Sequence, residues 1–228
     1  TDIVQLTGAK PVIVQCGIEQ SFKMTPKQLS SAISNNTKLI FLNSPSNPTG
    51  AVYSKAELRE LADILLNHPH VFIGTDDIYE HISLDETPFN NILMVEPKLK
   101  SQVIVLNGVS KAYSMTGWRI GYAAGPRDII KAMCKLQSQS TSNPTSISQV
   151  AAEAALRGNQ DCIKPMIKAF KERHVFVLKA LNEIEGIQCI PASGAFYAFA
   201  DARSAIEILF SKNKISGAND LALSEFLL

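Results

Sequence analysis

The sequence lacks the features that mark several classes of protein. Lysine and arginine together number 22 and aspartate and glutamate 21, so the formal net charge is only +1. A chain with so little net charge has no electrostatic reason to bind nucleic acid or an anionic membrane surface. No apolar run approaches the roughly 20 residues that cross a bilayer, and no signal peptide opens the chain. We therefore expect neither nucleic acid nor a membrane as a partner.

Cysteine and histidine are equally sparse. The four cysteines lie far apart and form no C-x-x-C pair, so neither a disulfide framework nor a zinc site is expected. A reducing cytoplasm is accordingly the expected location. The four histidines show no metal-ligand spacing either, and solvated or structural roles fit them. We expect no metal site.

The sequence does contain an alternation of short apolar runs with longer amphipathic ones. The short runs predict strands over residues 11–16, 38–42, 71–75, 102–106, 118–123, 186–190 and 195–199. The amphipathic runs predict helices over residues 25–33, 54–66, 127–136, 147–156 and 163–184. Strands that alternate with helices are typical of an α/β fold with a largely parallel sheet.

Polar residues follow three of the predicted strands. Asn47, Asp76 and Lys111 each come shortly after the end of a different strand. In an open parallel sheet these ends share one edge, where ligands bind. The pattern therefore brings an amide, a carboxylate and an amine into one crevice, together with the phenol of Tyr79.

Each of these residues, taken alone, is better explained by an ordinary structural role. An Asp or Tyr after a strand is usually a turn residue, a single Lys is usually a solvated amine, and Asn-Pro marks turns. Arg119 differs because it lies within an apolar run, where an unpaired charge is unfavourable, and this favours an anionic partner. Only the joint arrangement supports a site.

Three segments resemble the motifs of one enzyme family. Residues 108–121 (G-V-S-K-A-Y-S-M-T-G-W-R-I-G) resemble the attachment signature for pyridoxal 5′-phosphate (PLP) in class I aminotransferases. Residues 43–50 (N-S-P-S-N-P-T-G) resemble the family's N-P-x-N-P-T-G loop, and residues 76–79 (D-D-I-Y) its D-E-x-Y segment. Their order and separations match as well. The sequence is thus identified as a member of the class I/II PLP-dependent aminotransferases of fold type I, most similar to the prokaryotic aspartate aminotransferase branch.

PLP requires residues of these types. Its aldehyde forms an imine only with an unprotonated primary amine, which lysine supplies. Its pyridine nitrogen stays protonated beside a carboxylate, and its 3′-oxygen accepts hydrogen bonds from an amide or a phenol. Its phosphate binds arginine and helix N-terminal amides.

The resemblance implies a role for each residue. Lys111 resembles the Schiff-base lysine, whose freed amine would move a proton between the substrate α-carbon and the C4′ atom of the cofactor. Asp76 resembles the partner of the pyridine nitrogen. Tyr79 and Asn47 resemble the donors to the 3′-oxygen, and Asn47 would also meet the substrate carboxylate. Arg119 resembles the phosphate-binding arginine.

The sequence departs from the family's pattern at two positions. Gly108 stands where many members have serine, which removes a hydroxyl near the phosphate, and Ser110 or a backbone amide is expected to replace it. Asp77 stands where glutamate is commoner, and we expect its side chain to point away from the cofactor ring. The Asn47–Pro48 bond is usually cis in the family.

The resemblance also implies the domain organisation. It predicts a PLP-transferase type I large domain, with a mostly parallel mixed sheet flanked by helices, and the start of a smaller C-terminal α+β domain. We assign residues 1–160 to the PLP-binding large domain, with its N-terminal part missing, and residues 161–228 to a connecting long helix and a partial small domain. The chain lacks an initial Met and stops within a helical pattern, so we interpret it as an internal piece.

The implied activity is transfer of an amino group between an L-amino acid, expected to be aspartate, and a 2-oxo acid, expected to be 2-oxoglutarate, in a homodimer. The arginine that binds the α-carboxylate and the residues that set side-chain specificity are expected outside residues 1–228, so the isolated chain is expected to be inactive. Two alternatives stay open: another fold-type-I PLP enzyme, such as a lyase or synthase, and a PLP-fold effector-binding domain of a regulator. A Rossmann dehydrogenase is excluded because no G-x-G-x-x-G follows the first predicted strand.

Overall fold

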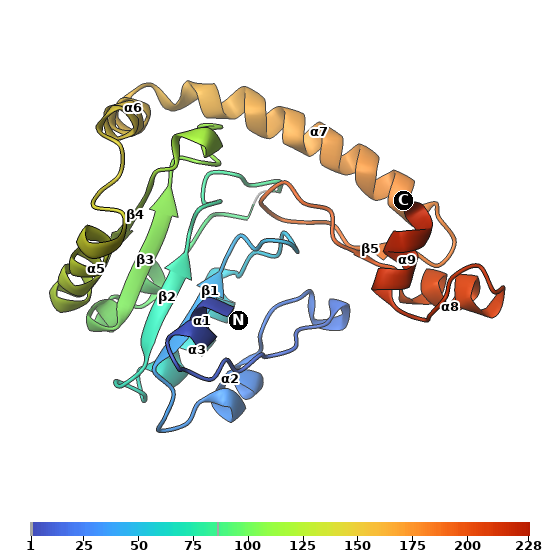
Figure 1. The fold of residues 1–228 in the computed structure, drawn as a ribbon, viewed down its shortest axis with the longest axis horizontal. Coiled ribbons are helices and arrows are strands. Elements are labelled where there is room, and N and C mark those ends of the chain that lie inside the picture. The colour runs from blue at the N-terminus through green and yellow to red at the C-terminus, as the bar shows by residue number, and fades with distance from the viewer. Residues whose placement is uncertain (1, 86) are drawn as a thin grey trace.

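A mixed β-sheet lies at the centre of the computed structural model, which describes residues 2–85 and 87–228 (Figure 1). Within this part of the chain the sheet has four strands in the order β1-β2-β3-β4. They are β1 (Leu39–Asn43), β2 (Phe72–Asp76), β3 (Val103–Gly108) and β4 (Gly121–Ala124). The first three strands are parallel, and β4 pairs antiparallel with β3. The predicted α/β fold with a mostly parallel mixed sheet is confirmed.

The register of the parallel strands brings their carboxyl ends together. Asn43 of β1 lies opposite Asp76 of β2, and Asp76 lies opposite Leu106 of β3. The amide of Asp77 continues the ladder by donating to the carbonyl oxygen of Leu106 at 2.9 Å. The loops that follow β1, β2 and β3 therefore leave the sheet at one common edge.

The helices α2 (Pro26–Ala32) and α3 (Lys55–Leu65) begin where the sequence predicts. Both start with a capping box, which satisfies amide groups that have no partner inside the helix. The apolar face of α3 is buried against the sheet, with its leucines at 2% exposure or less: Leu58, Leu61 and Leu65. Full burial of a leucine side chain contributes about 1.5–3 kcal/mol. This packing fixes the sheet from which the loops emerge.

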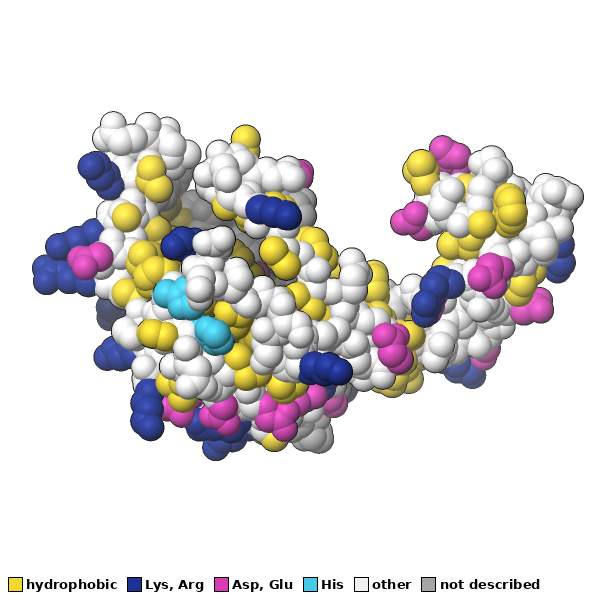
Figure 2. Space-filling model, turned by 90° about the horizontal axis from the view of Figure 1, so that it is seen from below, with side chains coloured by type: hydrophobic (Ala, Val, Ile, Leu, Met, Phe, Trp, Pro, Cys, Tyr) yellow, Lys and Arg dark blue, Asp and Glu magenta, His cyan; other side chains and the backbone are white. Residues whose placement is uncertain are grey.

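The long helix α7 (Ile163–Asn182) runs past the end of the sheet and connects its β4 side to the C-terminal elements (Figure 1). Seen from below, the lobe that holds the last helices stands apart from the main body across a hollow (Figure 2). The other helices are short α1 (Asp2–Leu6) and α4 (Ile92–Val95), then α5 (Arg127–Ser140), α6 (Ser146–Arg157), α8 (Arg203–Ser211) and α9 (Asp220–Leu227). A small antiparallel pair joins β5 (Gln188–Cys189) to β6 (Ala200–Asp201). In the part of the chain that is described, no helix is long and apolar enough to cross a membrane.

The strand predicted over residues 11–16 is wrong. Residues 11–17 have no regular secondary structure, and Val12 and Ile13 are 65% and 61% exposed. A β-prone run forms a strand only when a neighbouring strand completes its hydrogen bonds. No described strand pairs with this run.

The strand predicted over residues 195–199 is also wrong, and the one over residues 118–123 is shorter than predicted. Ala195 has a φ of 57°, in the left-handed region, so the chain turns there and β6 begins only at Ala200. Arg119 has the same kind of conformation (φ 56°, ψ 48°) after the 3₁₀ turn Thr116–Trp118, and β4 therefore begins at Gly121.

Candidate active site

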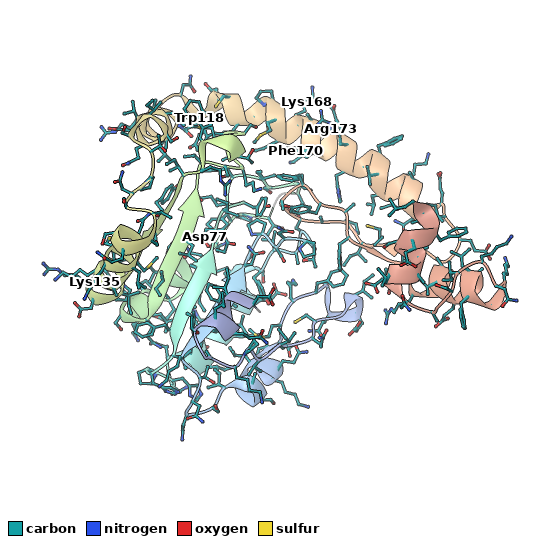
Figure 3. The ribbon with its side chains drawn as sticks, viewed as in Figure 1. Asp77, Trp118, Lys135, Lys168, Phe170 and Arg173 are labelled. Atoms are coloured by element: carbon teal, nitrogen blue, oxygen red, sulfur yellow. The ribbon has the colours of Figure 1, made fainter. Side chains whose placement is uncertain are left out.

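Two adjacent carboxylates lie where β2 ends. Asp76 is half-buried, and its Oδ1 atom accepts a hydrogen bond from the amide of Ile78 at 3.3 Å. Asp77 is 1% exposed and accepts from the Thr75 hydroxyl at 2.6 Å and from the Asn91 amide group at 2.7 Å. Burial raises the pKa of Asp77, although these two hydrogen bonds oppose the shift. Asp77 is held inside the protein (Figure 3), in agreement with the expectation that it does not face the site.

Lys111 lies in the turn that follows β3. Its Nζ atom is 5.7 Å from the centre of the Tyr79 ring and 5.8 Å from the centre of the Phe196 ring. Buried side chains anchor both ends of the loop, because Val109 and Ile120 pack together in one apolar cluster with exposures of 0% and 8%. None of the ion pairs among the described residues involves Lys111. Its amine is therefore not committed to a carboxylate.

Tyr79 lies in the turn after β2 and is 2% exposed. Its hydroxyl is 2.5 Å from the hydroxyl of Tyr197, and its ring meets the ring of Phe196 edge to face at 5.5 Å. Burial raises the pKa of Tyr79 well above the usual tyrosine range, and the hydrogen bond with Tyr197 raises it further. The phenol is therefore neutral at physiological pH and carries a proton that it can donate.

The loop after β1 contains cis peptide bonds at Ser44–Pro45 and at Asn47–Pro48. The predicted cis bond at Asn47–Pro48 is thus confirmed. The side chain of Asn43 connects this loop to β2, because it accepts from the Asn47 amide at 2.7 Å and donates to the carbonyl oxygen of Asp76 at 3.3 Å. Asn47 itself is exposed, and its side chain points to no partner that the structure records.

Arg119 and Ser110 flank the lysine loop. Arg119 is exposed rather than enclosed in an apolar strand, and its Nη1 atom donates to the carbonyl oxygen of Thr116 at 2.9 Å. No carboxylate pairs with Arg119 among the described residues. Ser110 is half-buried directly before Lys111. The guanidinium keeps most of its donors available for an anion.

Sequence reasoning missed Phe196, which lies beside Lys111, and the rings of Phe170 and Tyr197 that pack against Phe196. The ring of Phe196 stacks on Phe170 at 5.1 Å, and Phe170 comes from the side of α7 that faces the sheet (Figure 3). Tyr197 meets Tyr79 through both its ring and its hydroxyl. Residues 195–199 were predicted only as a strand. The density of aromatic residues in this segment was the available signal.

The chain matches the family described as Aminotransferase class I and II over residues 1–227. It belongs to this family. The prediction of the family from three motifs is confirmed, and with it PLP as the cofactor on which the family depends. Among the described residues no group of histidine, cysteine, aspartate and glutamate is arranged to hold a metal ion.

Curated relatives and solved structures agree with this assignment. The chain is 53% identical over 227 residues to the aspartate/prephenate aminotransferase of Nitrosomonas europaea, covering 100% of this chain and 57% of that protein. It is 50% identical over 200 residues to an aspartate aminotransferase of Rhizobium meliloti, covering 88% and 49%. The crystal structure of the aspartate aminotransferase from Rhizobium meliloti superposes with a TM-score of 0.87 at 48% identity, covering 89% and 51%. The aromatic aminotransferase from Pyrococcus horikoshii gives 0.82 at 35% identity, covering 86% and 52%. The chain spans about half the length of the curated relatives it matches.

The residues at this sheet edge fit PLP in their chemistry. A lysine amine that forms no ion pair among the described residues and a neutral phenol lie beside each other, with a carboxylate at the end of the adjacent strand. The exposed guanidinium of Arg119 suits a phosphate. Each functional group of the cofactor therefore has a suitable partner in this chain.

Proposed function

We propose that the protein carrying this chain is a PLP-dependent aminotransferase that moves an amino group between an L-amino acid and a 2-oxo acid. Aspartate and 2-oxoglutarate are the proposed substrate pair. The observation that carries the proposal is the position of the Lys111 amine, which lies against the Tyr79 ring at the edge where β2 presents Asp76. The names of the relatives support the choice of aspartate.

PLP, when bound, supplies an electron sink that makes the substrate Cα–H bond acidic. Lys111 is the proposed covalent attachment point and, once substrate has displaced it, the base that takes the proton from the substrate α-carbon. The aromatic rings of Tyr79 and Phe196 limit the positions open to its amine. A base held close to the carbon that it deprotonates gains the rate advantage of proximity.

The remaining residues hold charge or donate hydrogen bonds. The Asp76 carboxylate accepts a bond from one backbone amide, so most of its acceptor capacity is available to a protonated ring nitrogen. Tyr79 is neutral and donates a hydrogen bond to the 3′-oxygen. Asn47 donates a second one. Arg119 binds the phosphate, with Ser110 beside it. Asn47 also contacts the substrate carboxylate.

The assembly and the division into domains are part of the proposal. We propose a homodimer in which residues 1–160 belong to the PLP-binding domain and residues 161–228 to the connecting helix and the smaller domain. The start of α7 at Ile163 supports this division. A lyase or synthase on the same scaffold would keep the lysine bond but fail to transfer the amino group, so a transamination assay separates these alternatives.

The decisive experiment is chemical labelling of the lysine in the complete protein. Borohydride reduction in the presence of PLP should leave a pyridoxyl group on the peptide that contains Lys111. Lys111→Ala should abolish both the label and the absorption band of the lysine-bound cofactor. The control is Lys135→Ala, since Lys135 is exposed on α5 away from the carboxyl edge of the sheet (Figure 3). A label on another lysine would refute the proposed site.

A further inference from the structure

Tyr197 is the residue through which the C-terminal segment reaches the phenol of Tyr79. The two hydroxyl oxygens are 2.5 Å apart, and the two rings meet edge to face at 5.7 Å. The two residues are far apart in the sequence, because Tyr79 precedes α7 and Tyr197 follows it. Their contact is therefore a tertiary one that only the folded chain creates.

The backbone before Tyr197 is fixed by hydrogen bonds to both site loops. The amides of Ser193 and Gly194 donate to the carbonyl oxygen of Gly50 at 3.1 and 3.0 Å. On the other side, the amide of Ala195 donates to the carbonyl oxygen of Ile82 at 2.9 Å. Ala195 is fully buried against Tyr79 and Ile82. The Tyr197 side chain thus starts from a backbone that has little freedom to move away.

The proton arrangement between the two phenols depends on what else lies near Tyr79. A hydroxyl has one proton to donate, so in this pair one oxygen donates and the other accepts. If Tyr79 donated to Tyr197, it would present only lone pairs to an anionic acceptor in the site. If Tyr197 donates, the Tyr79 proton is available to that acceptor. The two hydrogen bonds then form a chain that ends on an anion, and each bond in such a chain strengthens the other.

We propose that Tyr197 is a positioning residue for Tyr79. By donating to the Tyr79 oxygen, the Tyr197 hydroxyl leaves the Tyr79 proton free for the 3′-oxygen of PLP. This inference rests on the proposed function and adds a residue to it. Tyr197 acts through Tyr79 and contacts neither the cofactor nor the substrate in this role, so its influence disappears when the Tyr79 hydroxyl is removed.

The test is a double-mutant cycle on PLP affinity in the complete protein, using Tyr79→Phe, Tyr197→Phe and the double variant. We expect Tyr197→Phe to weaken PLP binding by about two- to tenfold, the range of one hydrogen bond. In the Tyr79→Phe background the same change should have no further effect. The pH at which the bound cofactor changes its absorption band should also rise in Tyr197→Phe, because the 3′-oxygen anion loses part of its stabilisation.

The matched control is Tyr53→Phe. Tyr53 is buried and its hydroxyl accepts from the Met24 amide at 2.6 Å, in the core cluster beneath α2 and α3. Its replacement should lower the stability of the protein while leaving PLP affinity unchanged. A second cycle on the free energy of unfolding, measured without PLP, should show a non-zero coupling between Tyr79→Phe and Tyr197→Phe.

Three outcomes overturn the inference. Additive effects of Tyr79→Phe and Tyr197→Phe on PLP affinity would mean that Tyr197 does not act through Tyr79. An effect of Tyr197→Phe no larger than that of Tyr53→Phe, or zero coupling in the unfolding cycle, would also overturn it. Absence of a PLP label on Lys111 in the unsubstituted protein would instead overturn the proposed function, and the inference with it.

Discussion

Asp76 and Asp77 are neighbours in the sequence, yet their carboxylates lie in opposite environments. Asp76 is half-buried and accepts a hydrogen bond from a backbone amide, whereas Asp77 is 1% exposed and accepts from two buried polar side chains. Successive residues of a strand point to opposite faces of the sheet, and this alternation continues through the end of β2. One carboxylate is therefore available to a ligand, and the other stabilises the fold.

Substitution of the two aspartates should separate catalysis from stability. Asp76→Asn should lower the rate of transamination by about 10³-fold or more, if several kcal/mol of transition-state stabilisation are lost, with little change in stability. Asp77→Ala should lower the free energy of unfolding by roughly 1–3 kcal/mol, because Thr75 and Asn91 lose their buried acceptor. Steady-state kinetics and chemical denaturation measure the two effects. Equal losses of rate at both positions would contradict the assignment.

A methyl group at Gly50 should disrupt the contact between the β1 loop and the C-terminal segment. Gly50 has a φ of +67°, and a Cβ atom there would lie 2.3 Å from the Cβ of Ala192 and 2.9 Å from the carbonyl oxygen of Gly194. Gly50→Ala should therefore lower the free energy of unfolding by the roughly 1 kcal/mol of a left-handed alanine and by a further 1–3 kcal/mol of steric strain.

Gly8→Ala is the control for this substitution. Gly8 also has a positive φ, of +77°, but apart from Gly8 and its two chain neighbours no described residue has an atom within 4 Å of the added Cβ. The free energies of unfolding of the two variants, measured by heat or denaturant, should differ only by the steric strain at Gly50. Similar destabilisation of both would show that the Gly50 contact is looser than the structure indicates.

His174 should make the stability dependent on pH. Its Nε2 atom accepts a hydrogen bond from the Ala192 amide at 3.0 Å, and burial lowers the pKa of His174 below the ordinary 6.5. Between the lowered value and 6.5 the unfolded chain binds more protons, so stability falls as the pH decreases through this window. The slope for a single proton is at most about 1.4 kcal/mol per pH unit.

The measurement is the free energy of unfolding as a function of pH, followed downward from about pH 7. His174→Asn should lose the part of the slope that comes from this residue. His70→Asn, on the exposed turn before β2, should keep it. A slope that survives in His174→Asn would place the pH dependence elsewhere.

The isolated chain should be inactive with aspartate and 2-oxoglutarate even if it folds. By resemblance, we expect the arginine that holds the substrate α-carboxylate outside residues 1–228, and loss of such positioning has a large effect on rate. PLP should bind weakly and give little visible absorbance. Turnover close to that of the complete protein would mean that a carboxylate-binding residue lies within this chain.

Local signals allowed much of the fold to be predicted from the sequence. Thr25 was predicted to start a helix because Pro26 follows it at the first helical position, and Ser54 because Glu57 completes a capping box three residues later. The common edge of β1, β2 and β3 also followed from the pattern, since parallel strands must end on the same side. The pattern also placed Asn47, Asp76 and Lys111 at that edge, and the family motifs then implied a role for each.

The failures occurred where the outcome depends on residues far away in the sequence. Residues 11–16 have a strand-like composition, but strand formation depends on a pairing partner that periodicity does not reveal. Residues 195–199 have the apolar and aromatic composition of a strand, but the backbone turns at Ala195, where residues 193–195 bond to Gly50 and Ile82. For the same reason, periodicity did not place Phe196 and Tyr197 beside Tyr79, although the density of aromatic residues in the segment was a signal.

The hydrogen bonds from residues 193–195 back to Gly50 and Ile82 also order events during protein synthesis. All four described strands of the central sheet have been synthesised once Ala124 has emerged from the ribosome. The loops of the site still lack their later partners then, and at about 5–20 residues per second the nascent chain reaches Tyr197 only several seconds afterwards. The sheet is thus able to fold before the phenol pair exists, and the candidate site matures only after the sheet.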